Sequence, residues 1–137
     1  MVVHTLVVRD ERLLLLRRAG TGYRDGWYVL PGGHLRAGER VIDCAARELA
    51  EETGLAAAPE CLRPAVVLPY RSDGEQGIDF IVRCESVAGV PHIAEPDRCD
   101  DLGWWDVGAL PERTAPYIPL ALAMLERGEW FAEFGGF

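Results

Sequence analysis

Residues 33–55 organise the rest of the chain and read GHLRAGERVIDCAARELAEETGL. At about 100° per residue on a helix, Glu48, Glu51 and Glu52 fall within one narrow sector. Apolar or small side chains occupy the opposite side: Ile42, Ala45, Ala46, Leu49 and Thr53. The spacing therefore predicts a helix over residues 40–53, with one side packed on the core and the glutamates facing a cleft.

Carboxylates that converge on one side of a helix are most simply explained by a divalent cation. All-oxygen ligation favours a hard ion, magnesium or manganese, over zinc. Glu48 and Glu52 are also a like-charge pair four residues apart, which weakens an isolated helix. Only Arg47, four residues before Glu51, offers local compensation. A solvated acidic surface is the alternative, but it leaves the flanking glycines and Glu39 unexplained.

The same stretch carries a recognisable motif. Read as Gly-x5-Glu-x7-Arg-Glu-U-x-Glu-Glu-x-Gly-U, with U a bulky aliphatic residue, it resembles the signature of the Nudix hydrolases. Every fixed position is filled, by Gly33, Glu39, Arg47, Glu48, Leu49, Glu51, Glu52, Gly54 and Leu55. The resemblance implies an α/β fold, an α/β/α sandwich with a mixed sheet, and we expect residues 1–137 to form one such domain.

The resemblance also implies roles for single residues and a reaction. The implied metal ligands are three glutamates and one backbone carbonyl: Glu48, Glu51, Glu52 and Gly32. Glu48 or Glu52 would take the proton of an attacking water, and the residues leave that choice open. Glu39 would orient the motif, with Arg47 as its ion-pair partner. The bond cut would be a diphosphate bond in a nucleoside diphosphate linked to another moiety, with Mg²⁺ or Mn²⁺ as cofactor.

The resemblance further implies contacts to the substrate around this motif. It makes Arg18, and with it Arg17, candidate phosphate contacts; both end a strand just before the loop that leads to the acidic helix, and their planar forks suit phosphate. A solvated or structural role is the alternative for both. Gly33 allows positive φ and close approach of the backbone to a ligand. Trp104 or Trp105 would stack on a base, although one of the pair should alternate into the core.

Substrate class is indicated by a wider pattern. LPGGHLRAGE, AEPDRCDDLGWW and ALPERTAPY resemble MutT-type nucleoside-triphosphate pyrophosphohydrolases, which release a monophosphate and pyrophosphate. Some members take a further metal ligand from the loop before the last strand; Glu95 is the nearest candidate, because Val90 stands where an acid was expected. Asp100 and Asp101 would read a base edge or remain surface charges. Alternatives are a hydrolase of ADP-ribose, a dinucleotide or a nucleotide-sugar, and a non-catalytic nucleotide-binding regulatory module.

Composition narrows the class of partner. The net charge of −8 over 137 residues argues against a nonspecific binder of nucleic-acid polymers and leaves a small polyanion possible. The resemblance implies that this small partner is a nucleotide. No metal-binding spacing joins the four cysteines, which should be reduced thiols: Cys44, Cys61, Cys84 and Cys99. The apolar runs are too short for a membrane span, and the start MVVHTLVVRD lacks a signal peptide's features. We expect a cytoplasmic protein with no membrane partner.

Propensity and turn residues predict the remaining elements. Strands are expected over residues 2–8, 13–16, 27–30, 62–70, 78–84 and 102–105. The all-leucine run at 13–16 indicates a central strand, whereas Pro64 and Pro69 indicate an edge or interrupted strand. Turns are expected at residues 31–33 and 72–77.

The last part of the chain should be helical and then aromatic. Residues 106–110 could form a single helical turn, and Thr114 should cap a final helix that ends at Gly128. Gly54 should cap the acidic helix in the same way. The tail, residues 129–137, contains four aromatic residues, so it should pack on the domain or on a second subunit as a homodimer.

Overall fold

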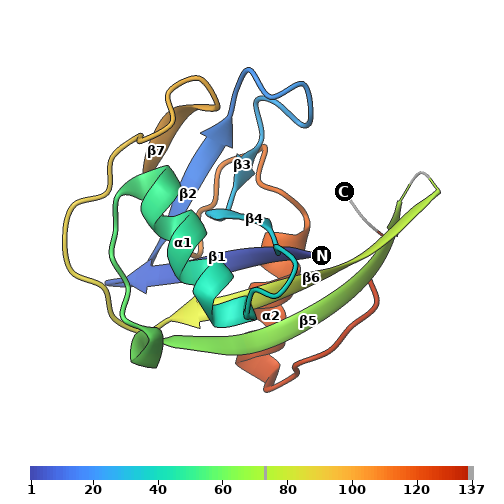
Figure 1. The fold of residues 1–137 in the computed structure, drawn as a ribbon. Coiled ribbons are helices and arrows are strands. Elements are labelled where there is room, and N and C mark those ends of the chain that lie inside the picture. The colour runs from blue at the N-terminus through green and yellow to red at the C-terminus, as the bar shows by residue number, and fades with distance from the viewer. Residues whose placement is uncertain (73, 136–137) are drawn as a thin grey trace.

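The computed structural model describes residues 1–72 and 74–135 (Figure 1). The strands are β1 (Val2–Arg9), β2 (Arg12–Arg18), β3 (Tyr28–Val29), β4 (Gly32–His34), β5 (Leu62–Ser72), β6 (Glu75–Cys84) and β7 (Cys99–Asp106). The helices are α1 (Val41–Thr53), the short 3-10 helix η1 (Pro59–Cys61) and α2 (Tyr117–Arg127). Three residues of the predicted turn and tail, Asp73, Gly136 and Phe137, lie outside the described residues.

The sheet is mixed and lies between the two longer helices. Its strand order is β3-β2-β1-β6-β5, with β4 paired to β1 and β7 paired to β2. Strands β1 and β6 run parallel, and the other paired strands are antiparallel. Helices α1 and α2 cover opposite faces (Figure 1). The predicted α/β/α sandwich is therefore confirmed. Among the described residues, no helix is long and apolar enough to cross a membrane.

Strand β2 supplies both sides of the core. Leu13 and Leu15 pack in the cluster beneath α2, and Leu14 packs in the cluster beneath α1. Successive side chains of a strand point to opposite faces, so an unbroken leucine run fits only a strand covered on both sides. All four leucines of the run are at most 2% exposed, and the predicted central strand is confirmed.

Strand β5 lies at the edge of the sheet, as its prolines predicted. Its pairing with β6 shifts register just after Pro64. The amides of Val67 and Arg71 donate to the carbonyls of Trp130 and Phe134, so the tail runs alongside the free edge. The tail thus packs on the domain's own β5, the first of the two expected arrangements.

The glycine turn predicted at residues 31–33 is instead a short strand. Gly32 and Gly33 pair with His4 and Val3 of β1, which draws this segment into the sheet as β4. Glycine has low strand propensity, so local sequence gave no indication of the pairing. The constraint comes from β1, because the backbones approach each other closely there.

Two predictions near the start of α2 are wrong. Residues 106–110 form no helical turn, because β7 continues to Asp106 and a reverse turn follows in which the Ala109 amide donates to the Asp106 carbonyl. Thr114 does not cap α2, since its hydroxyl donates to the Pro111 carbonyl over 2.6 Å. The helix starts later, with Pro116 at its N-cap. The predicted C-caps, at residues 54 and 128, are both left-handed glycines.

Candidate active site

A cleft of about 360 Å³ lies where α1, β2, β4 and the loop before β7 meet. It is lined by Leu16, Arg17, Arg18, Thr21, Val29, Gly32, Gly33, His34, Arg36, Arg47, Glu48, Glu51, Glu52, Glu95, Arg98 and Cys99. Acidic residues come from α1 and the loop before β7, and basic residues come from every side. The cleft therefore gathers the metal-ligand and the phosphate-contact candidates predicted from the sequence. The tryptophans predicted to stack on a base do not line it.

The packing of α1 turns its glutamates into this cleft. Ala45, Leu49 and Thr53 are fully buried on the opposite side, as the spacing predicted. The helix ends at Gly54, which has φ 76° and donates its amide to the Ala50 carbonyl. A Cβ at this position would lie 2.2 Å from the His92 ring, so only glycine fits. The left-handed conformation of Gly54 therefore ends the helix where the sequence predicted.

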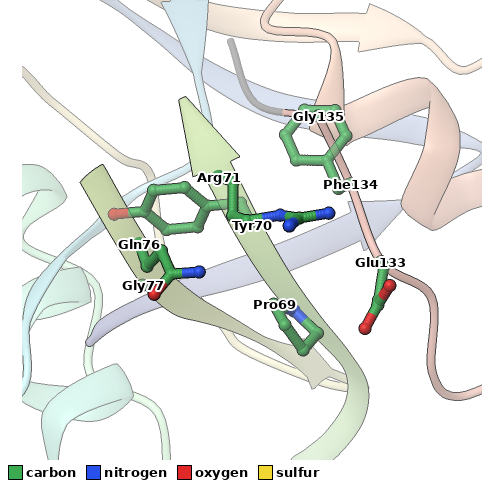
Figure 2. Close-up of a pocket in the computed structure, with 8 residues that line it drawn as sticks. All are labelled: Pro69, Tyr70, Arg71, Gln76, Gly77, Glu133, Phe134 and Gly135. Carbon is green, nitrogen blue, oxygen red and sulfur yellow. The ribbon is translucent and has the colours of Figure 1, made fainter. Parts of the chain in front are cut away.

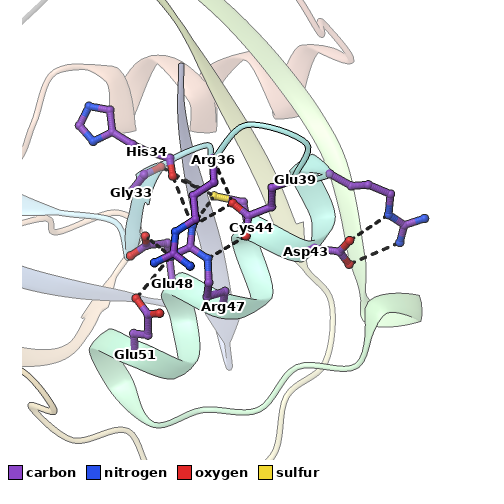
Figure 3. A network of polar contacts seen from close by, with 10 residues as sticks. Gly33, His34, Arg36, Glu39, Asp43, Cys44, Arg47, Glu48 and Glu51 are labelled. Atoms are coloured by element: carbon purple, nitrogen blue, oxygen red, sulfur yellow. Dashed lines mark hydrogen bonds and ion pairs between the residues drawn. The ribbon is translucent and has the colours of Figure 1, made fainter.

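Arg47 is the centre of an ion-pair network beside the cleft (Figure 3). Its Nε and Nη2 atoms donate to the two oxygens of Glu39 over 2.7 and 2.9 Å, a two-pronged contact. These bonds lower the pKa of Glu39 to about 2, although burial opposes the shift. The Nη1 atom of Arg47 lies 2.7 Å from Glu48 and 3.4 Å from Glu51. The structure thus contains the predicted Glu39 pair and extends it to the helix glutamates.

Glu52 is held from the other side of the cleft. Its Oε1 accepts the amide of Gly32 over 2.9 Å. Burial raises the pKa of the Glu52 carboxyl; the Gly32 amide opposes this shift, and the nearby Glu48 and Glu95 reinforce it. A carboxyl whose pKa rises for these reasons lies where positive charge is in short supply.

The two glycines of β4 are needed for space and not for unusual backbone angles. Neither has positive φ, which corrects the expectation for Gly33. A Cβ on Gly32 would lie 2.4 Å from the carbonyl oxygen of Val3. A Cβ on Gly33 would lie 2.4 Å from the carboxyl group of Glu48. The backbone of β4 therefore touches the sheet on one side and the acidic helix on the other.

The predicted phosphate-contact arginines both line the cleft. Arg17 donates to Asp100 over 2.7 Å, and Arg18 donates to the Tyr23 carbonyl over 2.7 Å and to the Thr21 hydroxyl over 3.0 Å. Arg18 thereby also organises the loop after β2. Each guanidinium is thus already bonded to the protein, and one of these partners, Thr21, also lines the cleft.

Sequence reasoning missed two further arginines, Arg36 and Arg98, that line the cleft. Both were visible in principle, since Arg36 lies inside the motif and Arg98 lies three residues after Glu95. Glu95 itself lines the cleft, so the structure brings it to the three helix glutamates. Burial raises the pKa of Glu95, with Arg98 opposing and the helix glutamates Glu48 and Glu51 adding to the shift.

The tryptophans lie away from the cleft wall. Trp105 packs in the cluster beneath α2, edge-on to Tyr28 with ring centroids 4.8 Å apart. Trp104 packs in the cluster beneath α1, with the Arg9 guanidinium 4.8 Å from its ring. Both rings thus face core clusters, and base stacking by Trp105 stays a prediction without a contact that supports it. Asp101, predicted to read a base edge or to remain a surface charge, instead accepts a hydrogen bond from the Tyr28 hydroxyl over 2.5 Å.

The carboxylate oxygens are suitable ligands for a hard divalent cation, but in their present orientation the side chains do not converge on one point. Within residues 1–72 and 74–135, no three acidic, histidine or cysteine side chains converge closely enough to hold an ion. Arg47 draws Glu48 aside, and the Gly32 amide holds Glu52. The donors are all oxygen, as magnesium and manganese prefer. The raised pKa of Glu52 fits a site that a cation would complete once Glu48 turns away from Arg47.

A larger groove, about 680 Å³, lies between the β5–β6 hairpin and the tail (Figure 2). Its lining includes one acid and one base, Glu133 and Arg71, both exposed. Figure 2 shows these two side chains on separate elements, with Phe134 beside them. The groove brings no group of charges together, so the acidic cleft is the better candidate for catalysis.

Comparison with known proteins gives relatives with several activities. The ADP-ribose pyrophosphatase of Methanocaldococcus jannaschii is 26% identical over 112 residues, or 82% of this chain and 64% of that protein. The chain thus spans less than two thirds of that relative. The isopentenyl-diphosphate Delta-isomerase of Cereibacter sphaeroides is 29% identical over 138 residues, or 90% of this chain and 76% of the isomerase.

The fold and the family agree. The structure of a MutT NUDIX hydrolase from Burkholderia pseudomallei superposes with a TM-score of 0.81 at 29% identity, covering 89% of this chain and 94% of that one. The family model of the NUDIX domain matches residues 1–125, which contain α1 and every residue that lines the cleft. The chain therefore belongs to the Nudix family.

Proposed function

We propose that this protein is a metal-dependent hydrolase of a diphosphate bond in a nucleoside diphosphate-linked substrate. The leading substrate class is the nucleoside triphosphates, cut to a monophosphate and pyrophosphate. The proposal is carried by the contact between α1 and β4. There the Glu48 carboxyl group packs against Gly33, and the Glu52 carboxylate accepts a hydrogen bond from the Gly32 amide. Residues 1–137 would act as one domain.

The charges of the cleft support this reaction. Glu48, Glu51 and Glu52 would hold the metal with the Gly32 carbonyl, and Glu95 is the candidate for a further ligand. A bound Mg²⁺ or Mn²⁺ ion supplies neutralisation of phosphate charge and a lowered pKa for bound water. The remaining catalytic requirement is positioning of the substrate and the attacking water.

Charged residues in and beside the cleft have a further part in the proposed reaction: Glu48, Glu52, Arg47, Glu39, Arg17 and Arg18. Glu48 or Glu52 accepts the proton of the attacking water, and both carboxylates line the cleft. Arg47 and Glu39 orient the motif through their two-pronged ion pair. Arg17 and Arg18 bind phosphate oxygens, because a planar guanidinium offers paired donors.

The test is a pyrophosphatase assay on Glu52→Gln in the presence of Mg²⁺. The amide keeps the shape of the side chain but removes the charge, so we expect a loss of activity of at least about a hundredfold. Glu126→Gln, an exposed position on α2, is the matched control and should retain full activity. Activity of Glu52→Gln close to that of the wild type would refute the assignment.

A substrate panel separates the competing activities. Pyrophosphate released from nucleoside triphosphates, with no AMP from ADP-ribose, supports the leading class. AMP from ADP-ribose favours the second class, which the named activity of the relative from Methanocaldococcus jannaschii motivates. Isopentenyl diphosphate belongs in the panel because a second relative is named as its isomerase. Nucleotide binding by calorimetry without turnover in Mg²⁺ or Mn²⁺ would favour a regulatory module.

A further inference from the structure

A buried chain of polar groups joins β6, β1 and the start of α2, outside the acidic cleft. The Nε2 atom of His4 lies 3.3 Å from Oδ1 of Asp79. The Tyr117 hydroxyl lies 3.2 Å from Nδ1 of His4, and the Leu30 amide donates to the Tyr117 oxygen over 3.3 Å. Tyr117 and Asp79 are only 5% and 8% exposed, so water is largely excluded from these contacts.

The chemistry of these groups gives each hydrogen bond a direction. In the neutral tautomer that carries its proton on Nε2, facing the Asp79 carboxylate, the His4 ring presents Nδ1 as an acceptor. The Tyr117 hydroxyl must then donate to Nδ1, which leaves its oxygen free to accept the Leu30 amide. Burial raises the pKa of the Tyr117 hydroxyl and keeps it a donor. Fully satisfied buried networks of this kind rigidify the backbone that they hold.

This polar chain reaches the wall of the cleft through a very short segment. Leu30 is 2% exposed and lies two residues before Gly32, whose amide binds Glu52. Gly32 also pairs with His4 between β4 and β1, and a Cβ on Gly32 would lie 3.1 Å from Nδ1 of the ring. Residues 30–32 are therefore held by the buried chain on one side and bound to the glutamate on the other.

We propose that Asp79, His4 and Tyr117 are positioning residues for the wall of the cleft. Acting through the Leu30 amide, they set the position of the backbone that holds Glu52. None of the three lines the cleft, so they act without touching substrate. The expected effect on turnover rests on the proposed function, whereas the expected effect on backbone position does not.

The test compares Tyr117→Phe with the matched control Tyr70→Phe, a half-buried tyrosine on β5 that does not line the cleft. The first change removes the hydroxyl and keeps the ring, which stacks 4.4 Å from the His4 ring. Amide NMR reports the position of Gly32, and an activity titration with Mg²⁺ reports the cleft. We expect a shifted Gly32 amide resonance and about a fivefold rise in the half-saturating Mg²⁺ concentration, the size of one lost hydrogen bond. The KM for nucleotide should stay unchanged, and the control should alter neither readout.

A second variant keeps the test decisive if the first folds poorly. His4→Gln can still donate to Asp79 but offers Tyr117 no ring nitrogen, so it should shift the Gly32 amide in the same way. If the groups act as one chain, the double variant should be little worse than either single variant. An unshifted Gly32 amide in a folded variant, or fully additive effects, would overturn the proposal. A wild type without turnover would instead overturn the proposed function, and the NMR comparison would still decide this one.

Discussion

Replacing Gly33 by alanine tests whether the position of the Glu48 carboxylate controls turnover. The new Cβ would lie 2.4 Å from that carboxyl group, whereas ordinary contacts begin at 3.4 Å. The carboxylate must therefore withdraw by about 1 Å, a displacement that can cost about a hundredfold in rate when catalysis depends on positioning. We expect kcat to fall by about this factor. The free energy of unfolding should fall by only about 1 kcal/mol, since a flexible side chain can give way.

The assay measures pyrophosphate release at saturating substrate and Mg²⁺, together with urea unfolding of the same samples. Gly108→Ala is the matched control, because its Cβ would meet Asp106 at an ordinary 3.7 Å on an exposed turn. It should leave both measurements unchanged. A Gly33→Ala enzyme with wild-type kcat would refute the reasoning, as would a kcat loss explained wholly by unfolding.

Three other perturbations have distinct expected outcomes. Gly32→Ala should lower the free energy of unfolding by about 3 kcal/mol in urea denaturation, because its Cβ meets the Val3 backbone and not a flexible side chain. The depressed pKa of Glu39 stabilises the fold above pH about 4.5, and this contribution should be lost as pH falls toward about 2. Thermal melts of Glu39→Gln should lack that decline; a wild-type decline at higher pH would contradict the assignment. Truncation after Gly128 should remove about 1 kcal/mol for each lost backbone hydrogen bond and cause association in sedimentation; a monomer of unchanged stability would contradict this.

The acidic side of α1 could be predicted because a helix repeats its contacts every three to four residues. The burial of Leu49 and the exposure of Glu51 follow directly from that period. The ion pair of Glu39 with Arg47 followed from the resemblance to a family, since the intervening residues 40–46 hide it from local rules. Within residues 39–52, therefore, the helix period and the motif together predicted which side chains are buried and which form the ion pair.

The remaining features depend on contacts that side-chain patterns do not record. The hydrogen bond from Gly32 to Glu52 uses a backbone amide, which every residue except proline possesses. The strand at β4 forms because β1 accepts it, against the propensity of two glycines. Thr114 has the composition of a helix cap, but its hydroxyl is taken by a nearer carbonyl, that of Pro111. Arg98 lines the cleft because the loop before β7 is bonded to the end of α1, where the His92 and Ala94 amides donate to the carbonyls of residues 53 and 52.

The pairing of residues 130–134 with the free edge of β5 has a consequence for synthesis of the protein. Strand β5 ends at Ser72, whereas the backbone that pairs with its free edge begins at Trp130. A chain growing on the ribosome must therefore carry an open strand edge until residues 130–134 have been synthesised. Pro64 and Pro69 lack the amide protons that a foreign strand would bind, and a register shift follows the first of them. These prolines protect the nascent edge from other strands until residues 130–134 pair with it.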